Sequence, residues 1–193
     1  MASAPKILAF AGSMRRESFN KRLVRIAAGG ARTAGGEVTL IDLRDYPLPI
    51  FDEDLEREQG LPDNAANLKR LFIEHDGFLI ASPEYNSSIT GVLKNTIDWV
   101  SRRVEGEMPL VAYKGKTAAL MSASPGALGG LRALVHVRAI LGNIGVLVLP
   151  TQVAVPKAME AFDADGKLKD PKLQASIEGL GKSLAQTIVK LKA

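Results

Sequence analysis

The sequence contains no cysteine and only two histidines, His75 and His136, among its 193 residues. The absence of cysteine excludes disulfides, thiolate nucleophiles, iron–sulfur clusters and cysteine-ligated zinc. Two histidines are too few for a three-histidine metal centre. His75 ends a predicted helix and His136 lies within another, so we interpret both as structural residues and predict no metal site.

Long apolar runs and clustered basic residues are missing as well. No apolar run approaches the roughly 18 residues of a membrane-spanning helix, and the N-terminal MASAPKILAFAG lacks the basic region of a signal peptide. We therefore expect a cytoplasmic protein without a membrane partner. Aromatic residues make up 5% of the chain and the lysines and arginines are dispersed, which argues against a nucleic-acid partner. The net charge of +4 mildly favours an anionic ligand.

Apolar, strand-like runs alternate with helical patterns along most of the chain. The predicted strands are 6–12, 38–43, 77–82, 117–123 and 145–155. The predicted helices are 18–34, 62–75, 91–103, 128–141 and 171–191. This alternation predicts one α/β domain over residues 1–193, built on a doubly wound parallel sheet. The connection 45–63 is rich in proline, and we expect a solvated, partly helical loop there.

Ligands of an open parallel sheet bind beyond the carboxyl ends of its strands. The loop after the first predicted strand is GSMRRESFN, residues 12–20, which lacks the glycine patterns of a P-loop or a dinucleotide fingerprint. Its helix N-terminus favours an anion, whereas Arg15 and Arg16 oppose the helix dipole unless an anion lies between them. The neutral donors of the loop are Ser13, Ser18 and Asn20. Two interpretations stay open: a phosphate cradle, or a helix capped by Ser18 whose arginines pair with Glu17 or water.

The loops after the third and fourth predicted strands reach the same edge of the sheet. SPEYNSSITGVLKN, residues 82–95, offers the ring of Tyr85 and the amide of Asn86. SASPGALGGLRA, residues 122–133, carries glycines that allow backbone to approach a ligand closely. On its residues alone, the loop 82–95 is also compatible with a turn-rich connection that packs Tyr85 on the surface, and the loop 122–133 with a glycine-rich turn that starts a helix.

Together, the three loops resemble those of the NAD(P)H-dependent FMN reductase family, flavodoxin-like proteins that include quinone, azo-dye and chromate reductases. The first loop matches G-S-x-R-x-x-S-x-N. The second matches P-E-Y-N and then G-x-L-K-N-x-I-D-W, ending at Trp99, and the third ends in G-x-x-G-G at Gly130. The resemblance spans roughly residues 5–155. It implies a flavodoxin-like three-layer α/β sandwich with a five-stranded parallel sheet in the order 2-1-3-4-5.

The resemblance also implies FMN as cofactor and NADPH or NADH as electron donor. The loop expected around the FMN phosphate comprises Ser13, Met14, Arg15, Arg16, Glu17, Ser18, Phe19 and Asn20. The residues expected along the ribityl chain and the isoalloxazine ring are Pro83, Glu84, Tyr85 and Asn86. Those expected on the remaining side of the flavin are Ser122, Ser124 and Gly126, in a looser match because Pro125 removes an amide donor.

A flavin carries out electron transfer itself, so the resemblance predicts no catalytic side chain. Hydride would pass from the nicotinamide to flavin N5, and the acceptor would then enter the same open site in a ping-pong mechanism. Quinones are the favoured small-molecule acceptors, beside azo compounds, chromate and ferric complexes. The alternatives are a flavodoxin-type electron carrier, which the charge of +4 disfavours, and a non-catalytic flavin-binding module.

Members of the family form homodimers or homotetramers, and we expect the same here. The predicted helix 91–103 is the candidate interface. Its apolar residues are Leu93, Ile97, Trp99 and Val100, although Trp99 also fits a core position.

Overall fold

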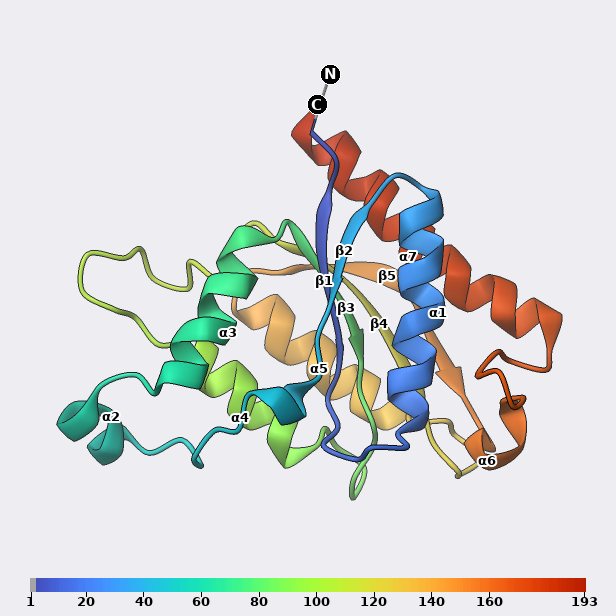
Figure 1. Ribbon diagram of the computed structural model, residues 1–193, viewed down its shortest axis with the longest axis horizontal. Coiled ribbons are helices and arrows are strands. Elements are labelled where there is room, and N and C mark those ends of the chain that lie inside the picture. The colour runs from blue at the N-terminus through green and yellow to red at the C-terminus, as the bar shows by residue number, and fades with distance from the viewer. Residues whose placement is uncertain (1–2) are drawn as a thin grey trace.

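The chain forms a five-stranded parallel sheet in the order β2-β1-β3-β4-β5, in a computed structural model that describes residues 3–193. The strands are β1 (Lys6–Ala11), β2 (Glu37–Leu40), β3 (Gly77–Ala81), β4 (Thr117–Ala123) and β5 (Leu147–Val155). β1 and β3 lie side by side although β2 separates them in the sequence (Figure 1). The sheet order and the parallel direction confirm the predicted doubly wound topology.

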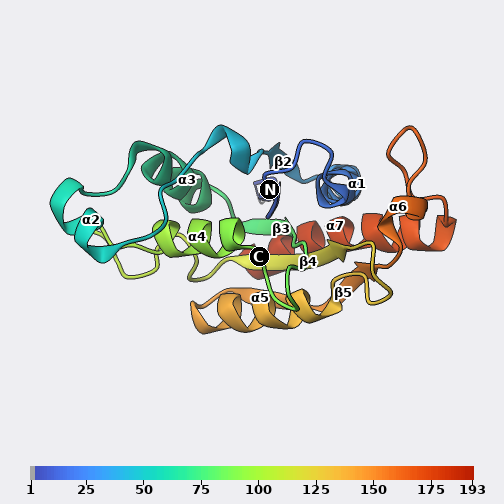
Figure 2. The ribbon, with the colours of Figure 1, turned by 90° about the horizontal axis from the view of Figure 1, so that it is seen from below.

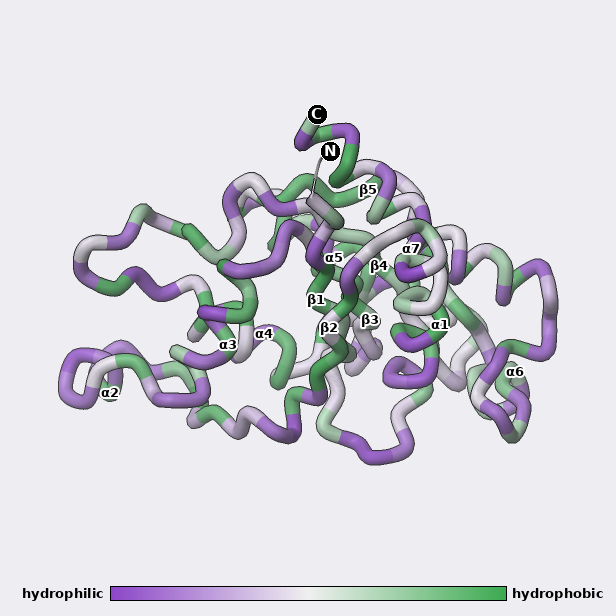
Figure 3. Tube along the Cα trace, turned by 45° about the horizontal axis from the view of Figure 1, so that its top comes forward, coloured by the Kyte–Doolittle hydropathy of each residue, from purple (hydrophilic) through white to green (hydrophobic). Residues whose placement is uncertain are grey.

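Helices cover both faces of the sheet, which confirms the three-layer sandwich (Figure 2). α1 (Phe19–Thr33) and α7 (Pro171–Lys192) cover one face. α3 (Asp63–Glu74), α4 (Gly91–Val100) and α5 (Leu131–Asn143) cover the other. Successive β1 residues alternate between the two cores: Ile7 and Ala9 face α1 and α7, whereas Leu8 and Phe10 face the opposite layer. This double burial explains the continuous apolar runs of the sequence, which appear as hydrophobic tube at the centre of Figure 3.

Glycines allow α1 and α7 to pack with their backbones almost in contact. A Cβ atom at Gly181 would lie 1.8 Å from the carbonyl oxygen of Ala27, and one at Gly30 would lie 2.0 Å from that of Glu178. No larger residue fits at either position without moving a helix. α7 thereby holds α1, whose N-terminus follows the loop after β1.

Several element boundaries differ from the sequence prediction by up to three residues. β2 ends at Leu40 because the Asp42 carboxylate accepts a hydrogen bond from the N–H of Arg44 and starts the 3₁₀ helix η1 (Leu43–Asp45). α5 begins at Leu131 rather than at residue 128 because Gly129 and Gly130 have φ angles of 62° and 92°. The helix α6 (Ala158–Ala161) was not predicted, whereas α2 (Glu53–Gln59) is the helical part of the connection 45–63.

The predicted interface residues on α4 are buried inside the protein. Leu93, Ile97, Trp99 and Val100 are at most 4% exposed. Leu93, Ile97 and Val100 belong to the core on this side of the sheet, and Trp99 packs edge-on against Phe51. The prediction of an interface through these side chains is therefore wrong, and the core interpretation of Trp99 is confirmed. The indole N–H of Trp99 donates to the carbonyl oxygen of Pro49, which ties the connection 45–63 to α4.

His75 has an interior role. Its two ring nitrogens form hydrogen bonds with the carbonyl oxygen of Leu71 and the hydroxyl of Thr39, and its side chain is buried. This arrangement agrees with the structural interpretation of His75. No helix among residues 3–193 is both long enough and apolar enough to cross a membrane.

Candidate active site

The loops after β1, β3 and β4 meet in one pocket beyond the carboxyl ends of these strands, the edge from which Figure 2 is viewed. Its lining residues are Ser13, Arg15, Ser18, Phe19, Asn20, Pro83, Glu84, Tyr85, Ala123, Ser124 and Pro125. This is the switch point of the sheet, where β1 pairs with both β2 and β3. The fold thus brings together the three loops that the sequence singled out.

The N-terminus of α1 presents donors without partners. Ser18 has the extended backbone of an N-cap residue, yet its side chain makes no capping hydrogen bond. Within residues 3–193, no hydrogen bond is donated by the backbone N–H groups of Met14, Arg16, Glu17 and Ser18. The first turn of α1 also contains no acidic residue. The helix dipole and the free N–H groups therefore favour an anion at this end of α1.

The two arginines of the loop are exposed and unpaired. In the described part of the chain, neither the Arg15 nor the Arg16 guanidinium forms a hydrogen bond or an ion pair, because Glu17 pairs with Arg22 at 3.2 Å. The expected capping of the helix by the Ser18 side chain and the expected pairing of the arginines with Glu17 are therefore wrong, whereas pairing of the arginines with water stays a prediction. Arg15 lines the pocket and Arg16 does not, so Arg15 is better placed to contact an anion there.

Asn20 lines the pocket and also holds two of its walls together. Its side-chain N–H₂ donates to the Ala123 carbonyl at 2.8 Å, and its side-chain oxygen accepts from the Ala123 N–H at 2.9 Å. The residue is 3% exposed. These two hydrogen bonds join the first turn of α1 to the end of β4. One N–H of the Asn20 amide is used in this contact and Asn20 lines the pocket, so the prediction that its second N–H donates to a phosphate stays a prediction.

The loop after β3 forms a tight hairpin at the pocket. Tyr85 and Ser88 exchange two backbone hydrogen bonds of 3.0 Å each, and Asn86 and Ser87 have positive φ angles of 50° and 65°. Such a two-residue turn holds Tyr85 at a defined position, with 54% of its surface exposed at the mouth of the pocket. Asn86 lies at the exposed tip of the turn and does not line the pocket.

Thr90 connects the first and second loops, and the sequence prediction missed this residue. Its hydroxyl donates to the Gly12 carbonyl at 2.7 Å and accepts from the N–H of Leu93 at 3.2 Å. Thr90 is therefore the N-cap of α4 and also links α4 to the loop after β1. A threonine just before a helical pattern is an N-terminal signal that could have identified it.

Glu84 is held by α5 rather than free in the pocket. Its carboxylate accepts hydrogen bonds from the backbone N–H groups of Arg132 and Ala133 at 3.0 and 3.3 Å. It also pairs with the Arg132 guanidinium at 2.9 Å, and the Glu84 side chain is only 9% exposed. The negative charge of Glu84 thus offsets the dipole of α5.

Ser122 lies beneath the third loop instead of facing the pocket. Its side chain is fully buried, and its hydroxyl is the one buried side-chain N or O atom within residues 3–193 that has no hydrogen-bond partner. The predicted contact of Ser122 with a flavin is therefore wrong. Ser124 does line the pocket, and its Oγ accepts weakly from the N–H of Gly126 at 3.4 Å. The predicted residues outside the pocket lining are Met14, Arg16, Glu17, Asn86, Ser122 and Gly126.

A family model described as NADPH-dependent FMN reductase matches residues 5–160. The chain belongs to this family. It is 35% identical over 179 residues to an NAD(P)H-dependent FMN reductase of Pseudomonas aeruginosa, covering 92% of each chain. It is 34% identical to an NAD(P)H:quinone oxidoreductase of Solanum tuberosum, covering 100% of this chain and 98% of that one.

Among solved structures, this FMN reductase family member is similar to a flavoenzyme NAD(P)H:(acceptor) oxidoreductase from Paracoccus denitrificans. The TM-score is 0.80 at 28% identity, with 96% of this chain and 98% of that chain covered. These findings confirm the family that the three loops indicated. The family match ends before α7, yet α7 contributes Ile177, Leu184 and Ile188 to the core under α1.

Proposed function

We propose that the protein is an FMN-dependent NAD(P)H:acceptor oxidoreductase. The observation that carries this proposal is the N-terminus of α1, where unpaired backbone N–H groups and the unpaired Arg15 adjoin one three-loop pocket. The FMN phosphate is a dianion, and this set of donors fits it. Of the two helices that begin beside the pocket, α5 already has Glu84 at its N-terminus, so α1 is the available phosphate site.

Each loop has a proposed share of the binding. The hydroxyls of Ser13 and Ser18 and the Arg15 guanidinium would bind the phosphate. Tyr85 and Ser124 would border the isoalloxazine ring, with Phe19 and Pro83 as apolar wall. The backbone N–H groups of Met14 and Arg16 would add donors.

Bound FMN would accept a hydride from NADPH or NADH and pass electrons on to an acceptor. The chain's own residues bind and orient these partners. Because Tyr85 is half-exposed at the mouth, donor and acceptor can enter the same site in turn, which supports a ping-pong mechanism. Quinones are the acceptors that the potato relative's name supports, and azo compounds, chromate and ferric complexes extend the proposal.

A flavodoxin-type electron carrier is the second candidate. Such carriers use acidic surfaces to meet protein partners, whereas this chain has a net charge of +4. Direct oxidation of NADPH or NADH by the purified protein distinguishes the reductase from a carrier and from a non-catalytic flavin-binding module.

The first test is cofactor binding and turnover. Purified protein should bind FMN, oxidise NADPH or NADH with a quinone, and yield parallel lines in double-reciprocal plots. Arg15→Ala should lower the affinity for FMN about tenfold or more, because one charge-assisted hydrogen bond contributes roughly 1.5–3 kcal/mol. Arg16→Ala is the matched control and should lower the affinity for FMN much less. A preparation that binds no added FMN overturns the proposal.

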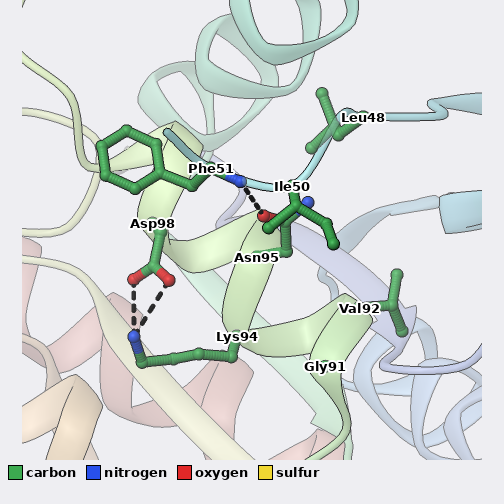
Figure 4. Close-up of a pocket in the computed structure, with 8 residues that line it drawn as sticks. All are labelled: Leu48, Ile50, Phe51, Gly91, Val92, Lys94, Asn95 and Asp98. Atoms are coloured by element: carbon green, nitrogen blue, oxygen red, sulfur yellow. Dashed lines mark hydrogen bonds and ion pairs between the residues drawn. The ribbon is translucent and has the colours of Figure 1, made fainter. Parts of the chain in front are cut away.

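We also propose that the protein forms a homodimer, or a homotetramer built from such dimers, through the exposed side of α4. The N–H of Phe51 donates to the side-chain oxygen of Asn95 at 2.8 Å (Figure 4). The Asn95 side-chain N–H₂ donates to the carbonyl oxygen of Pro49 at 2.8 Å. This anchored segment presents Ile50 with 86% of its surface exposed, beside an apolar pocket. Such a rigidly held apolar side chain suits a protein interface.

The charges on α4 fit a two-fold interface. Lys94 and Asp98 lie one helical turn apart and pair at 2.8 Å (Figure 4). If two copies pack with α4 antiparallel, each Lys94 can meet the partner's Asp98. Ile50→Lys should shift the sedimentation coefficient to that of a monomer. Exchanging the charges (Lys94→Asp with Asp98→Lys) should retain the oligomer, which each single reversal weakens. A monomeric wild type refutes the interface.

A further inference from the structure

The helix α5 begins without a cap of its own. Its N-cap residue is Gly130, which has a φ angle of 92° and no side chain to accept a hydrogen bond. A larger residue is excluded there, because a Cβ atom at Gly130 would lie 1.8 Å from the hydroxyl oxygen of Ser122. The first N–H groups of α5 therefore require an acceptor from another part of the chain.

Glu84 supplies this acceptor from the loop after β3. One oxygen accepts from the N–H groups of Arg132 and Ala133, and the other binds the Arg132 guanidinium. These residues are about 48 positions apart in the sequence. The contact joins the second and third loops at the pocket, because Glu84 precedes Tyr85 directly.

A second contact docks the same hairpin on α5. The hydroxyl of Ser88 and ring nitrogen Nδ1 of His136 lie 2.8 Å apart. Tyr85 is thus placed between two attachments, Glu84 to the first turn of α5 and Ser88 to its second turn. Tyr85 itself is 54% exposed, so these two attachments on either side of it help to fix its position.

We propose that Glu84 is a positioning residue: by capping α5 from the neighbouring loop, it holds Tyr85 where the flavin ring binds. This inference rests on the proposed function. It predicts that Glu84 acts on the ring and not on the phosphate, although both belong to one cofactor. Riboflavin, which has the ring but no phosphate, separates the two effects.

The experiment compares dissociation constants for FMN and riboflavin, measured by quenching of flavin fluorescence at 25 °C. Glu84→Ala should raise both constants by the same factor, at least tenfold. Glu84→Gln keeps an oxygen for the N–H groups of α5 and should recover part of this loss. Arg15→Ala should raise the constant for FMN only. Glu105→Gln removes an exposed carboxylate that pairs with no described residue, and should change neither constant.

Two further readouts separate positioning from stability. Urea unfolding identifies variants that remain folded at 25 °C, and visible circular dichroism of bound flavin reports the ring environment. The flavin signal should change in Glu84→Ala and stay unchanged in Glu105→Gln. The inference is overturned if Glu84→Ala lowers stability but leaves both constants unchanged, or if only the FMN constant rises. A wild type that binds neither flavin refutes the proposed function instead.

Discussion

Replacing Gly181 by alanine should push α7 away from α1. The new Cβ atom would lie 1.8 Å from the Ala27 carbonyl oxygen, whereas real Cβ contacts stay above 3.0 Å. The two backbones would have to separate by about 1 Å, which loosens the apolar contacts between the helices. Overpacking of this kind costs about 3 kcal/mol. Alanine returns about 1 kcal/mol of helix propensity, so we expect a net loss of about 2 kcal/mol in unfolding free energy.

Gly179 provides a matched control two residues away in the same helix. A Cβ atom there meets nothing within 4 Å. Gly179→Ala should therefore stabilise the protein by up to about 1 kcal/mol through helix propensity alone. The difference between the two variants, about 3 kcal/mol, isolates the contact because the propensity gain is common to both. Gly30 and Gly29 form a second such pair on α1, since Gly30 is in close contact and Gly29 is not.

Urea unfolding followed by the fluorescence of Trp99, the single tryptophan, measures both variants. The midpoint of Gly181→Ala should fall and that of Gly179→Ala should rise, and the melting temperatures should shift by about 4–8 °C downward and 2–4 °C upward. If the two midpoints shift in the same direction by similar amounts, the close approach of α1 and α7 does not occur in solution.

Three further substitutions test single polar side chains. Ser122→Ala should stabilise the protein by about 1 kcal/mol in urea unfolding, because it removes a buried hydroxyl without a partner; a loss of stability would mean that the hydroxyl has one. Asn20→Ala should lower the free energy of unfolding by about 3 kcal/mol, since the N–H and C=O of Ala123 lose their partners. It should also lower the affinity for FMN. Unchanged stability would contradict the contact between Asn20 and Ala123. The hydrogen bond from Lys69 lowers the pKa of Glu107 below its ordinary 4.5 even though burial opposes it. The stabilisation by this pair should thus be complete above pH 4.5 and disappear as the pH falls through the lower folded-state pKa. Glu107→Gln should lower the free energy of unfolding by about 2 kcal/mol at pH 7, and the loss of stability of the protein at acidic pH should become less steep. An unchanged pH dependence at acidic pH would show that the pair of Lys69 and Glu107 does not cause it.

Local sequence patterns were sufficient for the architecture but not for the roles of single polar residues. The apolar runs predicted all five strands. The three central strands β1, β3 and β4 are buried on both faces, a condition visible in the residues themselves, whereas the edge strands β2 and β5 are partly exposed. The end of β2 was wrong because the Asp42 side chain competes with the ladder for the backbone. The apolar residues of α4 were correctly recognised as a face, yet the pattern could not indicate whether the sheet or a second copy covers them.

The motifs by themselves indicated the family, and the family resemblance implied the sheet order. The motifs also marked the three loops at the pocket, because the glycine, arginine and hydroxyl residues that follow the strands can be read directly from the sequence. Only the tertiary structure decided which contacts the polar residues of these loops make. Asn20, Glu84 and Ser122 all belong to the predicted set, but Asn20 is bound to β4, Glu84 caps α5, and Ser122 is covered by Gly130. The reason is physical: a polar side chain takes the partner that folding brings within reach, and the partners of Asn20 and Glu84 lie 103 and 48 positions away in the sequence.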